Sequence, residues 1–124
     1  GESHVVPYLM LLAVVLLKVY GQLVIKARAI AHAAEASSGK LPYLVAMFTD
    51  VGVLSGLTAA VAASACWMLA IDRLDVAYAY PFMALCFVLV PVGATFLFGE
   101  RLPPIQLVGI GLIIVGVIVN ALGR

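Results

Sequence analysis

Four long apolar segments alternate with short polar ones along the chain, over residues of about 5–26, 51–71, 76–98 and 104–122. About 20 consecutive apolar residues are enough for a helix to cross roughly 30 Å of hydrocarbon. The pattern therefore predicts four membrane-spanning helices. We expect them to form a single domain over residues 1–124.

The longest connection, residues 27–50, contains helix-favouring sequence of its own. Its alanine-rich first part is expected to continue the first helix out of the membrane until Ser37-Ser38-Gly39 ends it. A second helix is expected to begin at Leu41-Pro42, because proline is favoured in a first helical turn. Its opening turns would lie at the membrane interface. The other two connections are short, Asp72–Asp75 and Gly99–Pro103. Short connections favour antiparallel neighbours, so the predicted fold class is an all-α four-helix membrane bundle.

Composition supports an integral membrane protein. The chain is 65% hydrophobic and 10% charged, with a mean hydropathy of +1.21. The formal net charge of +1 offers no basic surface for nucleic acid. No basic n-region precedes the first apolar segment and no cleavage pattern follows it, so we expect a retained span and not a signal peptide.

The basic residues favour one orientation. Four lie on one side of the predicted bundle and two on the other: Lys26, Arg28, Lys40 and Arg101 against Arg73 and Arg124. The positive-inside rule then places the first and third connections in the cytoplasm and both termini outside. Dual insertion stays an alternative.

Lys18 lies deep in the first apolar segment. A charged side chain at mid-bilayer costs roughly 2.5–3.5 kcal/mol on insertion scales. Lys18, Gln22 and Lys26 follow one another at helical spacing, and Gly21 leaves room beside them. This stripe predicts a polar track facing a cavity, with Lys18 binding an anionic head group. The alternatives are that Lys18 snorkels to an interface or pairs with a carboxylate for packing alone.

No carboxylate falls within the four predicted spans. An ammonium without a counter-ion can lose its proton, because desolvation disfavours the charged form. Lys18 is therefore a candidate anion site, a candidate proton-coupled site, or both.

The third span carries Tyr78 and Tyr80 beside Pro81. Proline donates no backbone hydrogen bond, so Pro81 predicts a kink that frees the carbonyl of Ala77. Both tyrosines are candidate substrate contacts. Tyrosines near a span end are also common interface anchors, and this alternative stays open.

Small residues mark one face of the fourth span. Four positions repeat at heptad spacing: Gly109, Ile113, Gly116 and Asn120. Such a face lets helix backbones approach closely, and Asn120 could bond across the contact. It predicts a dimer interface, although packing within the chain would explain the pattern equally well.

Catalytic and metal-binding chemistry has little support. Cys66 and Cys86 each lie alone in an apolar segment, as small buried hydrophobes do. His4 and His32 fall outside the spans, without acidic partners in the sequence pattern. We therefore expect no metal, no cofactor and no enzymatic activity.

Three motifs together resemble the small multidrug resistance proteins of the drug/metabolite transporter superfamily. They are the run Ala79–Leu85, the turn Gly99-Glu100-Arg101-Leu102, and Gly109 and Gly116 on the fourth helix. Gly21-Gln22-Leu23 followed by Lys26, together with the run Ala79-Tyr80-Pro81, is most similar to EamA-like subunits of the aminoarabinose-phosphoundecaprenol flippase. The resemblance implies a four-helix inner-membrane protomer that pairs with itself or a close relative. It implies a chamber lined by the first three helices, with Tyr80 near the substrate, and a fourth helix that builds the dimer.

Lys18 departs from the drug exporters. Aligning Gly21 and Lys26 with the family's glycine and lysine places Lys18 where those exporters carry an essential glutamate. A lysine repels a cationic drug and attracts an anion. The leading hypothesis is therefore a flippase, or flippase subunit, for a polyprenyl-phosphate-linked sugar. The alternatives are an exporter of small metabolites or drugs, and a non-transporting accessory subunit.

Overall fold

The computed structural model describes residues 2–123, with side chains from Val5 onward, and contains helices and no strands in that range. The side chain of His4 and all of Arg124 lie outside the described part. The elements in chain order are α1 (Glu2–Ala31), α2 (Ala33–Ser37), α3 (Lys40–Phe48), α4 (Val51–Ile71), α5 (Val76–Ala79), the 3₁₀ helix η1 (Tyr80–Leu85), α6 (Cys86–Phe98) and α7 (Pro104–Leu122).

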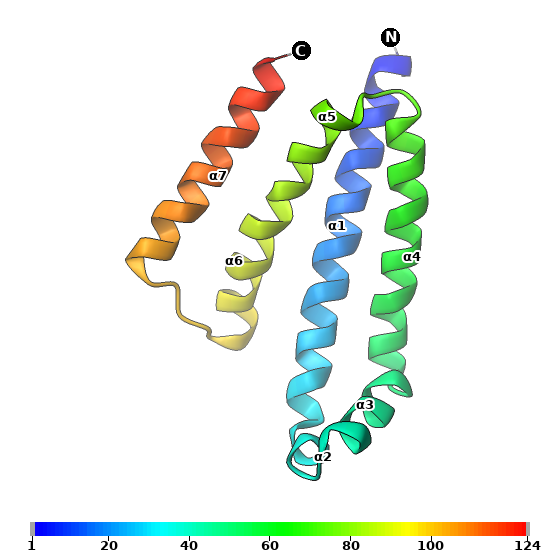
Figure 1. Cartoon of the computed structure of the whole chain (residues 1–124), viewed down its shortest axis with the longest axis vertical. Coiled ribbons are helices and arrows are strands. Elements are labelled where there is room, and N and C mark those ends of the chain that lie inside the picture. The colour runs from blue at the N-terminus through cyan, green and yellow to red at the C-terminus, as the bar shows by residue number, and fades with distance from the viewer. Residues whose placement is uncertain (1, 124) are drawn as a thin grey trace.

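Four segments are long and apolar enough to cross a membrane: Val5–Ala31, Val51–Ile71, Val76–Phe98 and Pro104–Leu122. This confirms the predicted fold class. In Figure 1, α1 and α4 run side by side, α5 to α6 follow on the other side of α1, and α7 is outermost. Both described ends of the chain lie at the same end of the bundle.

Glycines set the contact between α1 and α4. A Cβ atom on Gly21 would lie 3.1 Å from the carbonyl oxygen of Gly56, and one on Gly56 would lie 2.8 Å from Val24. One turn further, a Cβ on Gly52 would meet the side chain of Arg28 at 2.8 Å. The two helices thus approach closely because these positions carry no side chain, as is typical of helix packing in membranes.

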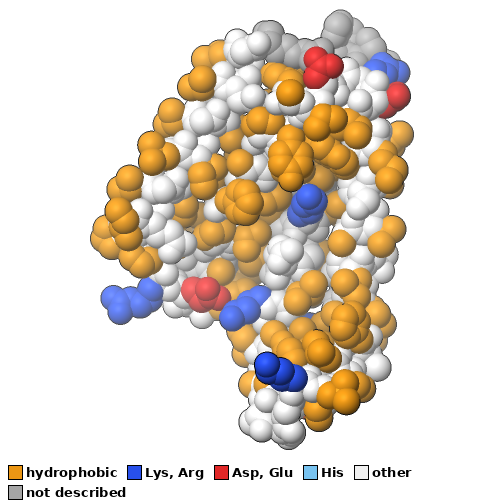
Figure 2. Space-filling view, in the orientation of Figure 1, with side chains coloured by type: hydrophobic (Ala, Val, Ile, Leu, Met, Phe, Trp, Pro, Cys, Tyr) orange, Lys and Arg blue, Asp and Glu red, His pale blue; other side chains and the backbone are white. Residues whose placement is uncertain are grey.

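The core is built from aliphatic side chains of α1, small or aliphatic ones of the other helices, and Leu74 from the α4–α5 connection. Its buried members are Leu11, Val14, Val15, Ala63, Ala70, Leu74, Ala79 and Met83. Most other large apolar side chains point outward, as Phe96 does with 85% of its surface exposed. The face shown in Figure 2 is mainly apolar. Its charged side chains lie near the upper end, near the α6–α7 turn and toward the lower end, and one basic side chain stands alone at mid-height. This distribution suits a molecule surrounded by lipid.

The third span changes helix type at Pro81, where the sequence predicts a kink. The chain is α-helical over Val76–Ala79, becomes 3₁₀ over Tyr80–Leu85 and returns to α at Cys86. Pro81 lies at the start of the 3₁₀ segment. Proline removes a donor from the α-helical ladder, and a 3₁₀ stretch within a longer helix is a recognised site of strain or hinging.

The connection 27–50 contains more helix breaks than the sequence predicts. The first helix ends at Ala31 and α2 follows as a separate short helix. The expected second helix is interrupted at Thr49–Asp50, so that α3 and α4 are distinct. Asp50 has an extended backbone, and its carboxylate accepts hydrogen bonds from the backbone N–H groups of Gly52 at 2.7 Å and Val53 at 3.2 Å. It therefore caps α4, and the cap ends α3.

Asp50 also joins α4 to the end of α1. Arg28 Nε donates to both carboxylate oxygens at 3.1 and 3.0 Å, and His32 Nε2 lies 2.7 Å from Oδ2. His32 Nδ1 lies 3.5 Å from Glu35. The expectation that His32 has no acidic partner is thus wrong. Asp50 is 18 positions from His32 in the chain, and only the fold of the connection brings them together.

The last helix is attached to one side of the bundle. α7 packs beside η1 and α6, with Ile110 and Val117 buried in that contact. The Asn120 amide donates to the backbone carbonyl of Tyr78 at 2.9 Å. Asn120 therefore bonds within the chain. The opposite side of α7 is apolar and bare, with Ile105 and Leu122 each 78% exposed.

Candidate functional site

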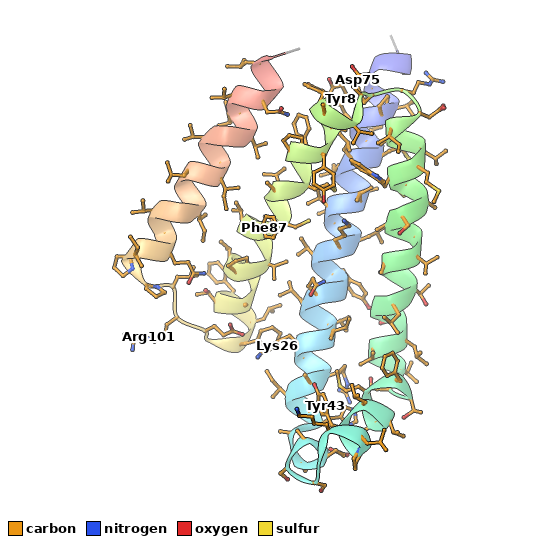
Figure 3. The ribbon with its side chains drawn as sticks, viewed as in Figure 1. Tyr8, Lys26, Tyr43, Asp75, Phe87 and Arg101 are labelled. Carbon is orange, nitrogen blue, oxygen red and sulfur yellow. The ribbon has the colours of Figure 1, made fainter. Side chains whose placement is uncertain are left out.

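The polar stripe on α1 faces away from α4. Gly21, Val24 and Arg28 lie on the side of α1 that meets α4. Lys18 and Gln22, by contrast, line a pocket of about 580 Å³ between α1 and the η1–α6 segment. Its other lining residues are Tyr80, Pro81, Met83, Ala84, Cys86, Phe87, Val90 and Pro91. Figure 3 labels Phe87, which extends from α6 on the side of α1.

Lys18 lies at the centre of its span. It is the middle residue of Val5–Ala31, and the Lys26–Glu100 ion pair marks the charged level about 12 Å further along the helix, at 1.5 Å per residue. Its side chain is exposed to the pocket. Among the described side chains, none forms an ion pair or hydrogen bond with its ammonium, and no carboxylate lines the pocket. The pocket thus holds an unneutralised cation in a mostly apolar wall.

Tyr80 enters the same pocket from the 3₁₀ segment and is 63% exposed. The ring of Trp67 on α4 packs edge-on against it, with centroids 5.8 Å apart and an interplanar angle of 77°. Such a pair fixes ring orientation while leaving the phenol free to reach a ligand. The sequence alone did not single out Trp67 as a neighbour of Tyr80.

Two predicted contacts lie elsewhere. Tyr78 belongs to an aromatic cluster at the end of the span, with its hydroxyl 3.0 Å from that of Tyr8 and its ring 5.3 Å from that of Phe82. Figure 3 labels Tyr8 at that end of the molecule. Gly21 is buried against Gly56 and is not among the pocket residues. The structure therefore brings together Lys18, Gln22 and Tyr80, and places Tyr78 and Gly21 outside this set.

Met83, Phe87 and Val90 are apolar lining residues that sequence reasoning missed. Together with Tyr80 they recur every three or four residues, which is one helical face. This spacing can be read from the sequence. It does not identify the pocket face, because the other faces of the third span are equally apolar. Cys86 also lines the pocket as a free thiol.

On α7, the glycines predicted to form a dimer contact are open. A Cβ atom on Gly109 or Gly116 would meet nothing within 4 Å, and Gly116 is exposed. Ile113 is half-buried on the same helix. Asn120, as described above, bonds to Tyr78. The dimer contact stays a prediction for all four residues, including Asn120, one amide N–H of which bonds within the chain.

A metal centre finds no support within residues 2–123. No group of three or more His, Cys, Asp and Glu side chains there is placed to hold a metal ion. The described residues form a pocket lined by one lysine, one side-chain amide and one phenol among mainly apolar side chains. It suits an anionic or polar ligand with an apolar part.

Comparison with known proteins agrees with this architecture. The EamA-like transporter family matches residues 8–122. A probable 4-amino-4-deoxy-L-arabinose-phosphoundecaprenol flippase subunit ArnE of Pseudomonas savastanoi pv. phaseolicola is 32% identical over 110 residues, which cover 89% of this chain and 92% of that protein.

Shorter matches point the same way. An ArnE subunit of the same description from Pseudomonas aeruginosa is 46% identical over 59 residues, 48% of this chain and 50% of that protein. A subunit named ArnF from Shewanella sediminis is 39% identical over 70 residues, 55% of this chain and 48% of that protein. In these two matches, the aligned part spans about half the length of the relative. No solved structure matches significantly. The nearly full-length family match and the four apolar helices confirm the resemblance seen in the sequence and the multi-pass inner-membrane location: the chain belongs to the EamA-like transporter family.

Proposed function

We propose that this chain is a subunit of a flippase that moves a polyprenyl-phosphate-linked sugar across the inner membrane. The observation that carries the proposal is Lys18, a cation at mid-span without a partner among the described side chains, exposed in a pocket of about 580 Å³. A charge in hydrocarbon is tolerated where it faces a cavity and serves a ligand. A phosphate group is the complementary charge. The relatives named as flippase subunits support this choice of substrate class.

In this proposal, each part of such a lipid contacts a different part of the pocket. Lys18 binds the phosphate, and Gln22 and Tyr80 form hydrogen bonds with polar groups next to it. The polyprenyl chain leaves between α1 and α6, over Met83 and Phe87. Movement requires no covalent step, so the protein acts as a transporter and not as an enzyme. The likeness to both ArnE and ArnF supports work as a pair of related four-helix subunits, either two copies or two different chains.

Lys18→Ala tests the proposal. In the full chain reconstituted in nanodiscs, the variant should bind undecaprenyl phosphate about 10- to 100-fold more weakly than the wild type, the usual range for a hydrogen bond to a charged group. Lys18→Arg should retain part of the affinity because it keeps the charge. Lys40→Ala is the matched control, since Lys40 lies at the start of α3, outside the candidate spans. Binding is measured by native mass spectrometry, with thermal unfolding as the check on folding.

Each result that would contradict the proposal points to a different alternative. Wild-type affinity in Lys18→Ala, or equal binding of undecaprenol without its phosphate, would overturn the phosphate site. Transport of small anions that requires a pH gradient would favour the exporter. Unchanged lipid transport in Lys18→Ala, when paired with a related subunit, would favour an accessory role.

A further inference from the structure

A second pocket continues the first along α1. It has a volume of about 330 Å³ and shares Gln22, Val90 and Pro91 with the pocket around Lys18. Its remaining lining residues are Leu23, Lys26, Ala94, Phe98, Glu100 and Gln106. The two pockets are parts of one groove, which we call the head-group groove. Lys18 lies at its membrane-buried end, and Lys26 and Glu100 lie at its charged end (Figure 3 labels Lys26).

Glu100 is the carboxylate of this groove. Of the acidic side chains that the structure describes, it is the one found among the lining residues of the two pockets. It follows Gly99, whose left-handed backbone (φ 68°) ends α6 and turns the chain toward α7. Lys26 Nζ lies 3.9 Å from Glu100, and both side chains are about half exposed, at 53% and 49%. Ion pairs as long and as exposed as this contribute little stability, so a ligand can replace Lys26 at low cost.

The groove therefore presents a cation at one end and an available anion at the other. Gln22 stands between, one helical turn or about 6 Å from both Lys18 and Lys26. Gln106 adds a second amide at the charged end. In an amino sugar joined to phosphate through its anomeric carbon, an amine at position 4 lies across the ring from the phosphate. Such a head group carries the two complementary charges: a negative phosphate at one end, to face Lys18, and a positive ammonium at the other, to face Glu100.

We propose that Glu100 binds the ammonium group of an amino sugar and selects lipid-linked amino sugars over neutral ones. The inference rests on the proposed function, because it requires the phosphate to lie at Lys18. When the head group binds, its ammonium takes the place of Lys26 on the carboxylate. Lys26 then turns to solvent, to which its side chain is already half exposed.

Two matched lipids test this selectivity: a polyprenyl phosphate that carries 4-amino-4-deoxyarabinose, and the same lipid carrying arabinose. The full wild-type chain in nanodiscs should bind the amino lipid about tenfold more tightly, as expected for one charge-assisted hydrogen bond. Glu100→Gln should bind both lipids with the affinity that the wild type has for the arabinose lipid. Glu100→Asp should keep part of the preference, which separates charge from simple disruption. Arg101→Gln, in the same turn but outside both sets of lining residues, should keep it entirely.

The outcomes separate this inference from the proposed function. If Lys18→Ala weakens the binding of both lipids and Glu100→Gln abolishes the preference, both are supported. If Lys18→Ala weakens both while Glu100→Gln retains the preference, or the wild type shows none, the role of Glu100 is overturned and the phosphate site stands. If Lys18→Ala binds both lipids as tightly as the wild type, the proposed function fails and this inference fails with it.

Discussion

At the scale of single residues, the charges within the connection 27–50 contrast with the charge at mid-span. Arg28 and Asp50 lie next to the span ends and are fully engaged, with guanidinium–carboxylate distances of 3.0–3.1 Å and the Asp50 side chain only 8% exposed. Lys18 lies at mid-span and has no described partner. A charge kept for packing alone would be neutralised as Asp50 is, because an unpaired charge in a low dielectric is costly. The contrast is the strongest residue-level argument that Lys18 serves a ligand.

The stability of the α1–α4 junction should depend on pH through His32. Its hydrogen bond with Asp50 raises the pKa of His32 above its ordinary value of 6.5, and Glu35 adds to the effect. The same contact, with Arg28, holds the pKa of Asp50 well below its usual range. A histidine whose pKa is raised by folding contributes stability that is fully present below pH 6.5. That contribution is lost as the pH rises through the folded-state value.

We therefore expect the midpoint temperature of thermal unfolding in detergent to decrease as the pH is raised above about 6.5. His32→Gln should remove this slope and leave the cap of α4 intact. Asp50→Asn should lower the midpoint at every pH, because it weakens the cap and the Arg28 pair together. A slope unchanged by His32→Gln would show that another group titrates in this range.

At the scale of elements, two faces of α1 make different contacts. One face packs closely on α4 through Gly21 and Gly56, and another carries Lys18 and Gln22 into the pocket. The rigid α1–α4 pair therefore presents the polar stripe to a third span that contains the 3₁₀ segment around Pro81. If the bundle alternates between two openings, the change of helix type at Tyr80–Leu85 is the natural place for bending.

Gly56→Val should destabilise the α1–α4 pair. The added side chain would push against Val24 and the carbonyl of Gly21, at Cβ distances of 2.8 and 3.3 Å. Overpacking of this kind costs about 1–3 kcal/mol. Gly111→Val is the control, because a Cβ there meets nothing within 4 Å. Equal unfolding midpoints for the two variants would contradict the close helix approach.

At the scale of the whole molecule, α7 is the least integrated helix. It touches the bundle through η1 and α6, while its other side exposes apolar residues such as Ile105 and Leu112. The three relatives reported above are named as flippase subunits, and a partner helix or a second copy covering α7 in the membrane stays a proposal. Asn120 bonds α7 to Tyr78 through one N–H of its side-chain amide, at 2.9 Å. The amide has a second N–H and a carbonyl oxygen for other contacts.

Gly116→Leu should lower the dimer fraction without unfolding the protomer. A Cβ at Gly116 meets nothing within 4 Å in the chain, so a larger side chain there can disturb only an intermolecular contact. Gly111→Leu, on another face of the same helix and equally open, is the matched control. Sedimentation in detergent or single-molecule photobleaching measures the dimer fraction. A dimer fraction unchanged by Gly116→Leu would move the interface to another face.

The linear order of the residues was enough to determine the four apolar segments, the depth of Lys18 and the helical alignment of Lys18, Gln22 and Lys26. Each depends on run length or on spacing within one helix, which are local properties. Which helix each face packs against was decided by the tertiary structure. The second and third spans are apolar all round, so no stripe in their sequences indicates which side turns inward.

Packing between distant segments therefore decided that Tyr80 enters the pocket while Tyr78 joins Tyr8, and that Gly21 meets Gly56. It also brought His32 and Asp50 together across the folded connection and joined Gln22, Glu100 and Gln106 in one groove. These contacts depend on how helices rotate and cross, which is fixed by side-chain shape and close backbone approach.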